Sequence, residues 1–496
     1  MDGRGKSDIP VVPAKLPNKA GRPAAEAVEE RGVAEGNTDG LTRPGRRAGP
    51  GVSSGLDRVR EVARKDKDAQ FSALLHHVDV RRLRSAYLAI RPQAAAGVDG
   101  VTWGAYGQNL EANLQSLHQR VHSGAYRASP SRRAYIPKAD GRLRPLGIAT
   151  LEDKIVQRAV VEVLNAIYEE DFLGFSYGFR PGRSPHDALD ALTVGIERRR
   201  VNWVLDADIR DFFTSLDHDW LTKFVEHRIA DKRVLRLIQK WIKAGVIEEG
   251  QWSESEVGAP QGASASPLLA NIYLHYVLDR WVRQWRRRQA HGEVIIVRFA
   301  DDFVAGFEHR ADAEQFLADL KERFSKFGLE LHPDKTRLIE FGRNAARDRK
   351  ARGEGKPETF DFLGFTHMCG KNNSGGYWLR RKTISKRMRA KLAEVKDQVK
   401  RRRHLPVPEQ GKWLRSVVRG HLNYYAVPGN TDTVQAFRRE VTKYWFAALR
   451  QRSQRSRLTW TRMNRIATYW LPPARALHPF PIVRFNVRTQ GRSPVR

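Results

Sequence analysis

The sequence predicts an α+β protein with two or more domains behind a disordered N-terminal tail. Two apolar, β-rich runs meet at an adjacent pair of aspartates within residues 294–307, which predicts a hairpin with two carboxylates at its tip. Residues 201–209 alternate like a strand, so that Asp206 and Asp208 share one face and apolar side chains share the other. Apolar residues at helical spacing fill long stretches on both sides of these strands. A chain of 496 residues also exceeds the size at which a single core is usual.

The composition indicates a partner that carries many negative charges. The formal net charge is +32, and arginine and lysine are spread through the whole chain, which favours nucleic acid over an acidic protein. A membrane surface is the competing explanation, but no apolar stretch approaches the roughly 18 to 20 residues needed to span a bilayer. The single cysteine, Cys369, excludes a disulfide framework and any zinc site with several cysteines. The N-terminus lacks the apolar core of a signal peptide, so we expect a cytoplasmic protein.

Helices and short strands can be assigned along most of the chain. Residues 1–55 are rich in Gly, Pro, Ala, Arg and Glu and nearly free of aromatic residues, which predicts a disordered, mildly basic tail. Two short strands, 135–138 and 144–148, flank a turn that contains glycine. Apolar spacing predicts helices at residues 110–117, 152–168, 217–229, 268–277, 311–327 and 385–403. We interpret the basic run 283–288 as a solvated helix end.

Three carboxylates fall at the ends of two predicted strands: Asp208, Asp301 and Asp302. Aspartates at a turn are often solvent-exposed turn residues and no more, and this interpretation stays open for the adjacent pair taken alone. The third carboxylate favours a metal site instead. Hard divalent ions such as Mg2+ take oxygen ligands, and two of them about 3.5 to 4 Å apart can clamp the attacking and leaving oxygens of a phosphoryl transfer. Carboxylates from the two predicted strands provide such a clamp.

The acidic motifs resemble those of one polymerase class. Asp208 is followed by Ile209 and later by Phe213, and the sequence Phe-Ala-Asp-Asp stands at 299–302. Together they are similar to the palm of reverse transcriptases. Retroelement polymerases more often have tyrosine where this chain has the phenylalanine of the second motif.

Two further motifs resemble specifically the group II intron reverse transcriptases, or maturases. The first is Gly-Ala-Pro-Gln-Gly at 258–262, which continues to Ser-Pro-Leu-Leu-Ala-Asn at 266–271. The second is Ser-Tyr-Gly-Phe-Arg-Pro-Gly-Arg-Ser at 176–184. The match follows the order of the family from about Arg81 to the C-terminus.

The resemblance implies a right-hand polymerase fold. Fingers and palm of the reverse transcriptase type would occupy residues 56–368, an α-helical thumb or maturase domain residues 377–477, and a short basic tail residues 478–496. The cluster of Gly, Asn and Ser at 369–376 predicts the domain boundary. Residues 417–425 resemble part of the thumb or maturase domain.

The resemblance also implies an enzyme, an RNA-directed DNA polymerase that binds group II intron RNA to assist splicing and mobility. Its partners would be template RNA, a DNA primer, deoxynucleoside triphosphates and the intron RNA. The primer 3′-oxygen would attack the α-phosphate while Mg2+ held by Asp208 and Asp301 neutralises developing charge. Asp302 would help to organise the same site. The sequence does not set an oligomeric state.

Six residues are expected to contact the incoming nucleotide. The resemblance assigns Lys138 and Arg144 of a β-hairpin to its triphosphate, although basic residues on a hairpin are often only solvated edge residues. It places Lys335 near the same triphosphate and Phe213 under the sugar, where the ring would obstruct a 2′-hydroxyl. In the segment 258–262, which contains Gln261 and Gly262, glycine allows a nucleotide or template strand to approach the backbone closely.

Four basic residues are expected to contact nucleic acid. By resemblance, Arg180 and Arg183 lie on a loop along the template and primer, with a plain solvated loop as the alternative. Arg387 and Lys391 lie on the helix 385–403, whose apolar stripe predicts one packed face and one face open to phosphates. Aromatic and basic residues also interleave from 413 to 470, which suits stacking on unpaired bases, while core packing explains about half of them.

Two alternative functions were weighed against the polymerase. An RNA-binding splicing maturase with little polymerase activity predicts loss of the aspartates, and all of them are present. A domesticated reverse transcriptase in phage defence fits poorly with the maturase-like residues 413–425. The segment after His478 has no cysteine pairs, so we expect no cysteine-rich endonuclease and a DNA primer from another source, such as a nascent strand at a replication fork.

Overall fold

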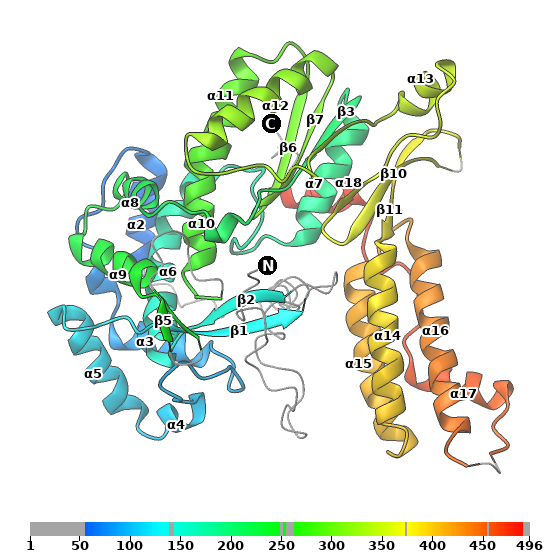
Figure 1. The fold of residues 1–496 in the computed structure, drawn as a ribbon, viewed down its shortest axis with the longest axis horizontal. Coiled ribbons are helices and arrows are strands. Elements are labelled where there is room, and N and C mark those ends of the chain that lie inside the picture. Colours follow the sequence, from blue (N-terminus) through cyan, green and yellow to red (C-terminus); the bar gives the residue numbers. More distant parts are fainter. Residues whose placement is uncertain are drawn as a thin grey trace, which may run out of the picture.

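The structure is a computed structural model that describes residues 55–137, 143–248, 251–253, 262–372, 374–453 and 456–489. The predicted tail therefore lies outside the described residues except for Gly55. Figure 1 shows a helical group with a small sheet, a second sheet flanked by helices, and a bundle of long helices on the right. We call these three groups the fingers, the palm and the thumb.

The fingers are built around one long buried helix, α6 (Leu151–Asp171), which confirms the helix predicted at 152–168. Helices α2 (Gly55–Lys65) and α3 (Val80–Leu88) pack against it and share its apolar cluster. The predicted hairpin is also confirmed, because β1 and β2 pair in an antiparallel register that sets Ile136 opposite Arg144. The remaining elements are η2 (Leu75–His77), α4 (Trp103–Gly107), α5 (Leu110–Ser123), β1 (Ser131–Pro137), β2 (Leu143–Ile148), α9 (Lys232–Lys243), β4 (Val246–Glu248) and β5 (Gln251–Ser253).

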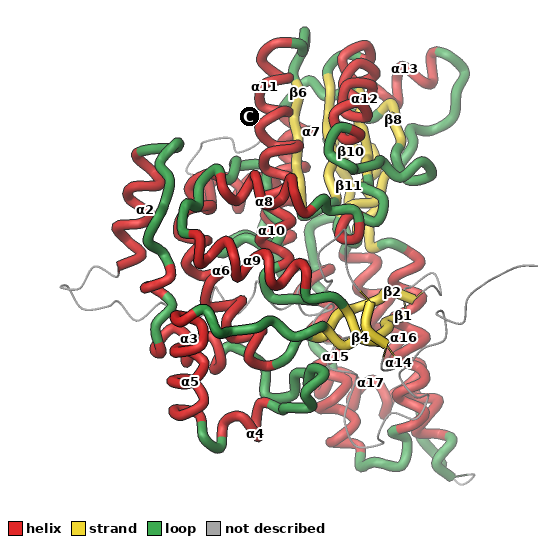
Figure 2. Tube along the Cα trace, turned by 60° about the vertical axis from the view of Figure 1, so that its left-hand side comes forward, coloured by secondary structure: helices red, strands yellow, loops and turns green. Residues whose placement is uncertain are grey.

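The palm sheet has the strand order β6-β7-β3-β8, and all its pairs are antiparallel. Helices cover both faces of this sheet. Leu205 packs in the cluster that contains α10 and α12, whereas its neighbour Val204 packs in the cluster that contains α7. The alternating strand predicted at 201–209 is therefore present, but its second face is buried too. Figure 2 shows the palm strands gathered between the helices. The strands are β3 (Trp203–Ala207), β6 (Val294–Phe299), β7 (Asp302–Phe307) and β8 (Arg337–Glu340).

The palm helices match the predicted helices with shifted ends. The segment predicted as one helix at 268–277 is α10 (Ser266–Leu274), which runs through a π-helix, η4 (His275–Asp279), into α11 (Arg280–Arg288). Single π-turns inside α-helices are frequent at functional sites. The other helices are α7 (Pro185–Arg198), η3 (Phe212–Thr214), α8 (His218–Glu226), α12 (Arg310–Ser325) and α13 (Ala345–Ala351).

The predicted domain boundary at 369–376 is instead the turn of a β-hairpin. Strand β10 (Phe365–Lys371) pairs along its whole length with β11 (Tyr377–Thr383), and β9 (Phe360–Phe362) pairs with the start of β10. Gly and Asn therefore cluster here because a tight turn needs them, which a sequence pattern cannot distinguish from a linker. The thumb helices begin only after β11, at Ser385.

The thumb is a bundle of helices around its own apolar core. The helix predicted at 385–403 is confirmed as α14 (Ser385–Arg401), and Leu392, Val395 and Val399 are buried as its stripe predicted. Of the interleaved aromatic residues, Trp445 is fully buried whereas Tyr469 is 72% exposed, so core packing explains only some of them. The other helices are α15 (Val407–Tyr425), α16 (Thr431–Arg450) and α17 (Trp460–Trp470).

The predicted C-terminal tail is wrong in its first part, because helix α18 (Pro481–Thr489) packs against α7 of the palm. Phe485 is buried there. Arg484 forms an ion pair with buried Asp190, whose other oxygen accepts a hydrogen bond from Arg381 at 3.2 Å. The sequence predicted a tail because the basic residues of this segment make its one apolar face difficult to recognise. Among the described residues, no helix is both long and apolar enough to cross a bilayer.

Candidate active site

The two predicted carboxylate strands meet at one end of the palm sheet. Phe299 pairs with Asp302, which leaves Ala300 and Asp301 as a two-residue turn and confirms the predicted hairpin. Ala300 has a φ of +57°, the left-handed conformation that tight hairpin turns require. In the neighbouring pair Ala207 lies opposite Phe303, so Asp208 follows directly beside the turn. The fold thus gathers all three predicted aspartates.

Burial and neighbouring negative charges disfavour the ionised form of carboxylates at this end of the sheet. Desolvation and then the negative charges of Asp301 and Asp208 raise the pKa of Asp302 to about 8, although its side chain is exposed at the surface. The neighbouring negative charges raise the pKa of Asp302 even where solvent reaches its carboxylate. Burial likewise raises the pKa of Asp206 to about 6. This end of the sheet therefore favours a bound cation.

The carboxylate pair fits a magnesium ion. Within the described ranges, no three side chains of His, Cys, Asp or Glu are grouped closely enough to hold a metal ion by themselves. Mg2+ in nucleotide-processing sites usually binds through one or two carboxylates and completes its shell with water and substrate phosphates. Asp208, which follows β3, and Asp301, in the turn between β6 and β7, carry carboxylates of this kind.

Lys335 lies at the same site. Its ammonium group forms an ion pair with the carboxylate of Asp208. The backbone holds the two residues together, because the N–H of His332 donates to the carbonyl of Asp208 at 2.8 Å and Ile209 bridges to Leu331. The sequence prediction that Lys335 belongs to the nucleotide site is thus compatible with its position.

A buried charge network holds the turn formed by Ala300 and Asp301, which we call the catalytic turn. Arg298 is fully buried and forms an ion pair with Asp279 of the π-helix at 2.5 Å. Its Nη1 donates to the carbonyl of Ala300 at 2.9 Å and to Oδ1 of Asn271 at 3.1 Å, and its Nη2 donates to Oγ of Ser176 at 2.7 Å. Sequence reasoning missed this network. Arginine inside an apolar strand was the signal, because a buried charge requires a partner.

The loop 176–184 packs against the turn. A Cβ atom on Gly178 would lie 2.2 Å from the backbone nitrogen of Ala300, so only glycine fits. The carbonyl of Gly178 accepts a hydrogen bond of 2.7 Å from Asn271. Phe179, which the sequence did not single out, is 52% exposed with a φ of +56°, and its ring centroid lies 6.4 Å from that of Phe299.

The structure contradicts the predicted nucleic-acid role of Arg180 and gives Arg183 an internal role. Arg180 is only 4% exposed, forms an ion pair of 3.0 Å with Glu169, and donates to two backbone carbonyls. Arg183 is partly buried, donates to the carbonyl of Gly174 at 2.6 Å and lies over the ring of Tyr177. Both guanidinium groups therefore hold the backbone of residues 173–176. A sequence motif cannot show which way an arginine points.

Two of the predicted nucleotide contacts lie outside the described residues, and a third is described only through its backbone. Lys138 and Gln261 lie outside the described residues, and Arg144 is described only through its backbone in β2. Gly262 has a φ of +103°, and a Cβ atom there would lie 2.9 Å from the carbonyl oxygen of Gly147 on β2. Glycine therefore allows the backbone at residue 262 to lie close to the fingers hairpin.

Of the two adjacent phenylalanines after Asp208, the first lies in the core and the second lies at the surface. Phe212 is buried, whereas the next ring, that of Phe213, is only partly buried and meets it edge to face at 5.4 Å. The chain turns through Asp211, whose φ is +42°. Phe213 therefore lies on the accessible side of this turn.

Arg387 of α14 lies close enough to the carboxylates to affect one of them. It is exposed, and its charge lowers the pKa of Asp302 against the larger upward effects described above. Gly364, in a left-handed turn between β9 and β10, packs beside its guanidinium. Lys391 is different, because it is only 27% exposed and pairs with Glu394 at 2.9 Å. The expected open basic face of α14 is thus less uniform than its spacing suggested.

Part of this sequence matches a family model and the sequences of known proteins. Residues 136–367 match the family model described as "Reverse transcriptase (RNA-dependent DNA polymerase)". The chain is 40% identical over 239 residues to "Protein YkfC" of Escherichia coli (strain K12), covering 42% of this chain and 62% of that protein. It is 35% identical over 237 residues to "Group II intron-encoded protein LtrA" of Lactococcus lactis subsp. cremoris, covering 47% of this chain and 39% of that protein.

A plant protein is also similar to part of this chain. "Nuclear intron maturase 3, mitochondrial" of Arabidopsis thaliana is 30% identical over 142 residues, which is 28% of this chain and 19% of that protein. The chain thus spans less than two thirds of the length of each of these three relatives. The matched family region includes both strands that carry the site's aspartates. Residues 136–367 therefore match a reverse transcriptase domain, and the chain is similar over part of its length to a group II intron-encoded protein and an intron maturase.

Proposed function

We propose that this protein is an RNA-directed DNA polymerase that depends on Mg2+. The observation that carries the proposal is the meeting of Asp208, Asp301 and Asp302 on adjacent strands at one end of the palm sheet. Mg2+, when bound by Asp208 and Asp301, would polarise phosphate oxygens and lower the barrier to phosphoryl transfer. Both carboxylates are part of the region that matches the reverse transcriptase family.

Five other residues have proposed roles in binding the substrates or in holding the site. Lys335 brings a positive charge beside Asp208, where it can meet the triphosphate of the incoming nucleotide. Phe213 offers an aromatic edge for the sugar, and Gly262 keeps the backbone open for a close approach. Arg387 reaches from the thumb toward the same carboxylates, where a primer strand would need its phosphates neutralised. Arg298 holds the catalytic turn in place.

Primer extension tests this proposal. The full chain is incubated with a DNA primer annealed to an RNA template, deoxynucleoside triphosphates and Mg2+, and the extended primer is measured. We expect extension on the RNA template and none when Mg2+ is chelated. A protein that binds the template and primer but never extends it would instead be a splicing maturase without polymerase activity.

We further propose that the protein binds group II intron RNA and assists its splicing. The names of two relatives, a group II intron-encoded protein and a nuclear intron maturase, support this role. The strongly basic composition supports an RNA partner. Splicing of an intron transcript with and without the protein tests the role independently of DNA synthesis.

Substitution of Phe213 tests the proposed choice between deoxynucleotides and ribonucleotides. We expect Phe213→Val to relax discrimination by about tenfold or more, because the smaller side chain leaves room for a 2′-hydroxyl. The measurement is the ratio of kcat/KM for a deoxynucleotide and its ribonucleotide. Phe212→Leu is the matched control, since that ring packs in the core and should leave the ratio unchanged. An unchanged ratio in Phe213→Val would place the sugar elsewhere.

Charge reversal tests the separate roles of Arg387 and Lys391 on α14. We expect Arg387→Glu to slow extension by about tenfold or more, because it adds negative charge beside crowded carboxylates. Lys391→Glu faces Glu394 instead, so it should lower stability slightly and change extension little. Extension rates, intron RNA affinity and thermal unfolding are compared for both variants. Equal losses of extension would mean that α14 grips nucleic acid along its length.

A further inference from the structure

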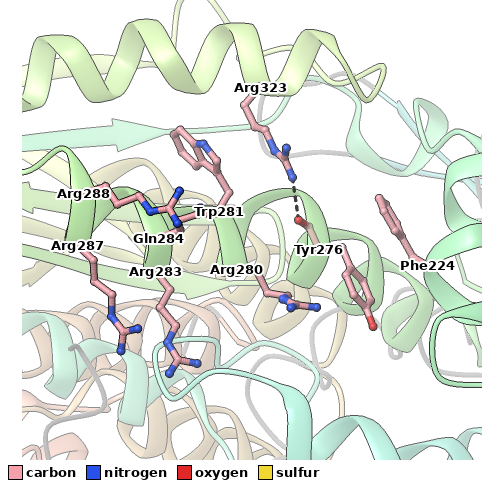
Figure 3. Close-up of a pocket in the computed structure, with 9 residues that line it drawn as sticks. All are labelled: Phe224, Tyr276, Arg280, Trp281, Arg283, Gln284, Arg287, Arg288 and Arg323. Carbon is pink, nitrogen blue, oxygen red and sulfur yellow. Dashed lines mark hydrogen bonds between the residues drawn. The ribbon is translucent and has the colours of Figure 1, made fainter. Parts of the chain in front are cut away.

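An arginine-rich groove lies on the outer side of the palm, where the sequence suggested a solvated helix end. It has a volume of about 540 Å³ and is lined by residues of α8, the π-helix, α11 and α12. Figure 3 shows the side chains of this groove around α11, and Figure 1 shows α8 and α11 on the side of the palm away from the thumb. The lining contains five arginines and no acidic residue. Such a lining favours an anionic ligand.

The arginines form one stripe along α11. Arg280, Arg283 and Arg287 follow one another at helical spacing, and Figure 3 shows the three side chains extending from the same side of the helix, with Arg288 on an adjacent face. All four are exposed, and none is paired with a carboxylate within the part of the chain that the structure describes. Basic residues in the last turn of a helix balance its dipole, but Arg280 and Arg283 lie earlier than that turn. The stripe therefore calls for another explanation.

Aromatic rings lie beside the stripe. The rings of Phe224 and Tyr276 stack at 5.1 Å with 12° between their planes, and the guanidinium of Arg280 lies 5.6 Å from the centre of the Tyr276 ring. Both rings are only partly buried, as is that of Trp281. A groove that combines aromatic faces with guanidinium groups suits a nucleic acid strand with unpaired bases, because phosphates meet the arginines and bases stack on the rings.

The backbone of the groove is held rigidly. Arg323 of α12 donates to the carbonyls of Val277 and Tyr276, at 3.0 and 3.1 Å, and so satisfies groups that the wide turn of the π-helix leaves open. The hydroxyl of Tyr276 lies 3.1 Å from Nδ1 of His227. A rigid site loses less entropy when it binds a flexible strand than a mobile site would.

We propose that this groove binds a single-stranded segment of RNA outside the polymerase site. The choice of RNA rests on the proposed function, in which only a short part of a long RNA occupies the site at the palm carboxylates. The remainder of that RNA crosses the protein surface, and unpaired loops are the parts of RNA whose bases can stack on protein side chains. The groove would then anchor the RNA while the catalytic turn copies another part of it.

The test removes the four exposed charges together. In Arg280→Gln/Arg283→Gln/Arg287→Gln/Arg288→Gln, binding of a labelled oligouridylate of about 20 nucleotides is measured while an unlabelled template and primer saturates the polymerase site. We expect binding at least about tenfold weaker at about 0.15 M salt. We also expect the slope of log affinity against log salt to flatten by about 3, since each single-strand phosphate contact contributes about 0.7. Extension of a short template and primer should keep its wild-type rate.

A matched control removes four exposed charges elsewhere: Arg81, Lys350, Lys356 and Lys371, each changed to glutamine. The control should bind the oligouridylate within about twofold of the wild type. Equal weakening in both variants, or none in the groove variant, overturns the proposal. So does tighter binding of oligothymidylate DNA than of the RNA. A change in sedimented mass with unaltered RNA binding would make the groove a protein interface and would overturn it too.

If the wild type fails to extend any primer, the proposed polymerase function fails, but the groove is still tested by oligouridylate binding. If extension succeeds and the groove variant binds RNA normally, only the groove fails. The variant Arg280→Lys/Arg283→Lys/Arg287→Lys/Arg288→Lys adds a second measurement. It keeps the charges but loses the planar groups that stack, so we expect it to keep the salt slope and bind at least about threefold more weakly.

Discussion

Asp301→Ala is expected to abolish primer extension, with a loss of at least about 10^3-fold in rate, while binding of RNA stays nearly unchanged. Removal of this carboxylate takes away a proposed oxygen ligand of Mg2+, and stabilisation of charge in phosphoryl transfer by a metal is worth several kcal/mol. Asp208→Ala should have the same effect, because Asp208 follows β3 directly beside the turn that contains Asp301. Single-turnover extension on an annealed RNA template measures the rate, and filter binding measures the affinity for RNA.

Asp206→Asn provides the matched control for this experiment. Asp206 lies in β3, two positions before Asp208. It is partly buried and forms an ion pair with Arg337 at 3.7 Å. It should keep extension within about tenfold of the wild type, because it supports the strand and is not a proposed ligand. A larger loss in Asp206→Asn than in Asp208→Ala would reverse the assignment of the two aspartates. Normal extension by the double variant of Asp208 and Asp301 would remove the palm site from the proposal.

Arg298→Met is expected to destabilise the protein by about 3 to 5 kcal/mol and to remove most of its extension activity. The substitution leaves the carboxylate of Asp279 buried without its ion-pair partner, which costs far more than the pair contributes. It also removes the donor to the carbonyl of Ala300 in the catalytic turn. Thermal unfolding measures the first effect, and extension well below the unfolding temperature measures the second.

The double variant Arg298→Met/Asp279→Leu separates positioning from stability. It removes both buried charges, so we expect most of the lost stability to return. Extension should remain slow, because the Ala300 carbonyl still lacks its donor and the turn is less well held. Recovery of extension together with stability would show that Arg298 acts through stability alone.

Most of the site could be predicted from sequence where local pattern sets the geometry. The strand periods and the adjacent aspartates were sufficient to expect the hairpin 294–307, because alternation fixes which residues reach the end of a strand. The position of Lys335 beside Asp208 followed from resemblance, and the structure brings the two together. Helix α14 was predicted nearly to its ends because its apolar stripe is regular.

Features that depend on distant contacts could not be predicted. The direction of the Arg180 side chain depends on carbonyls that become available only when the loop folds. The partner of Arg298 lies on a π-helix that has no clear sequence signature. The turn at 369–376 has the composition of a linker, and only pairing between β10 and β11 distinguishes it. In each case the deciding partner is far away in the sequence or invisible to a helix or strand period.

The contact between α18 and α7 makes the palm a discontinuous folding unit. Asp190 of α7 meets Arg381 and then Arg484, a partner 294 residues further along the chain. During synthesis, α7 and its neighbours therefore leave the ribosome long before the helix that covers them has been translated. Until then this apolar surface and the buried carboxylate have no lasting cover, which is a state in which nascent chains bind chaperones or aggregate. Residues 481–489 thus complete the packing of a helix that begins at residue 185.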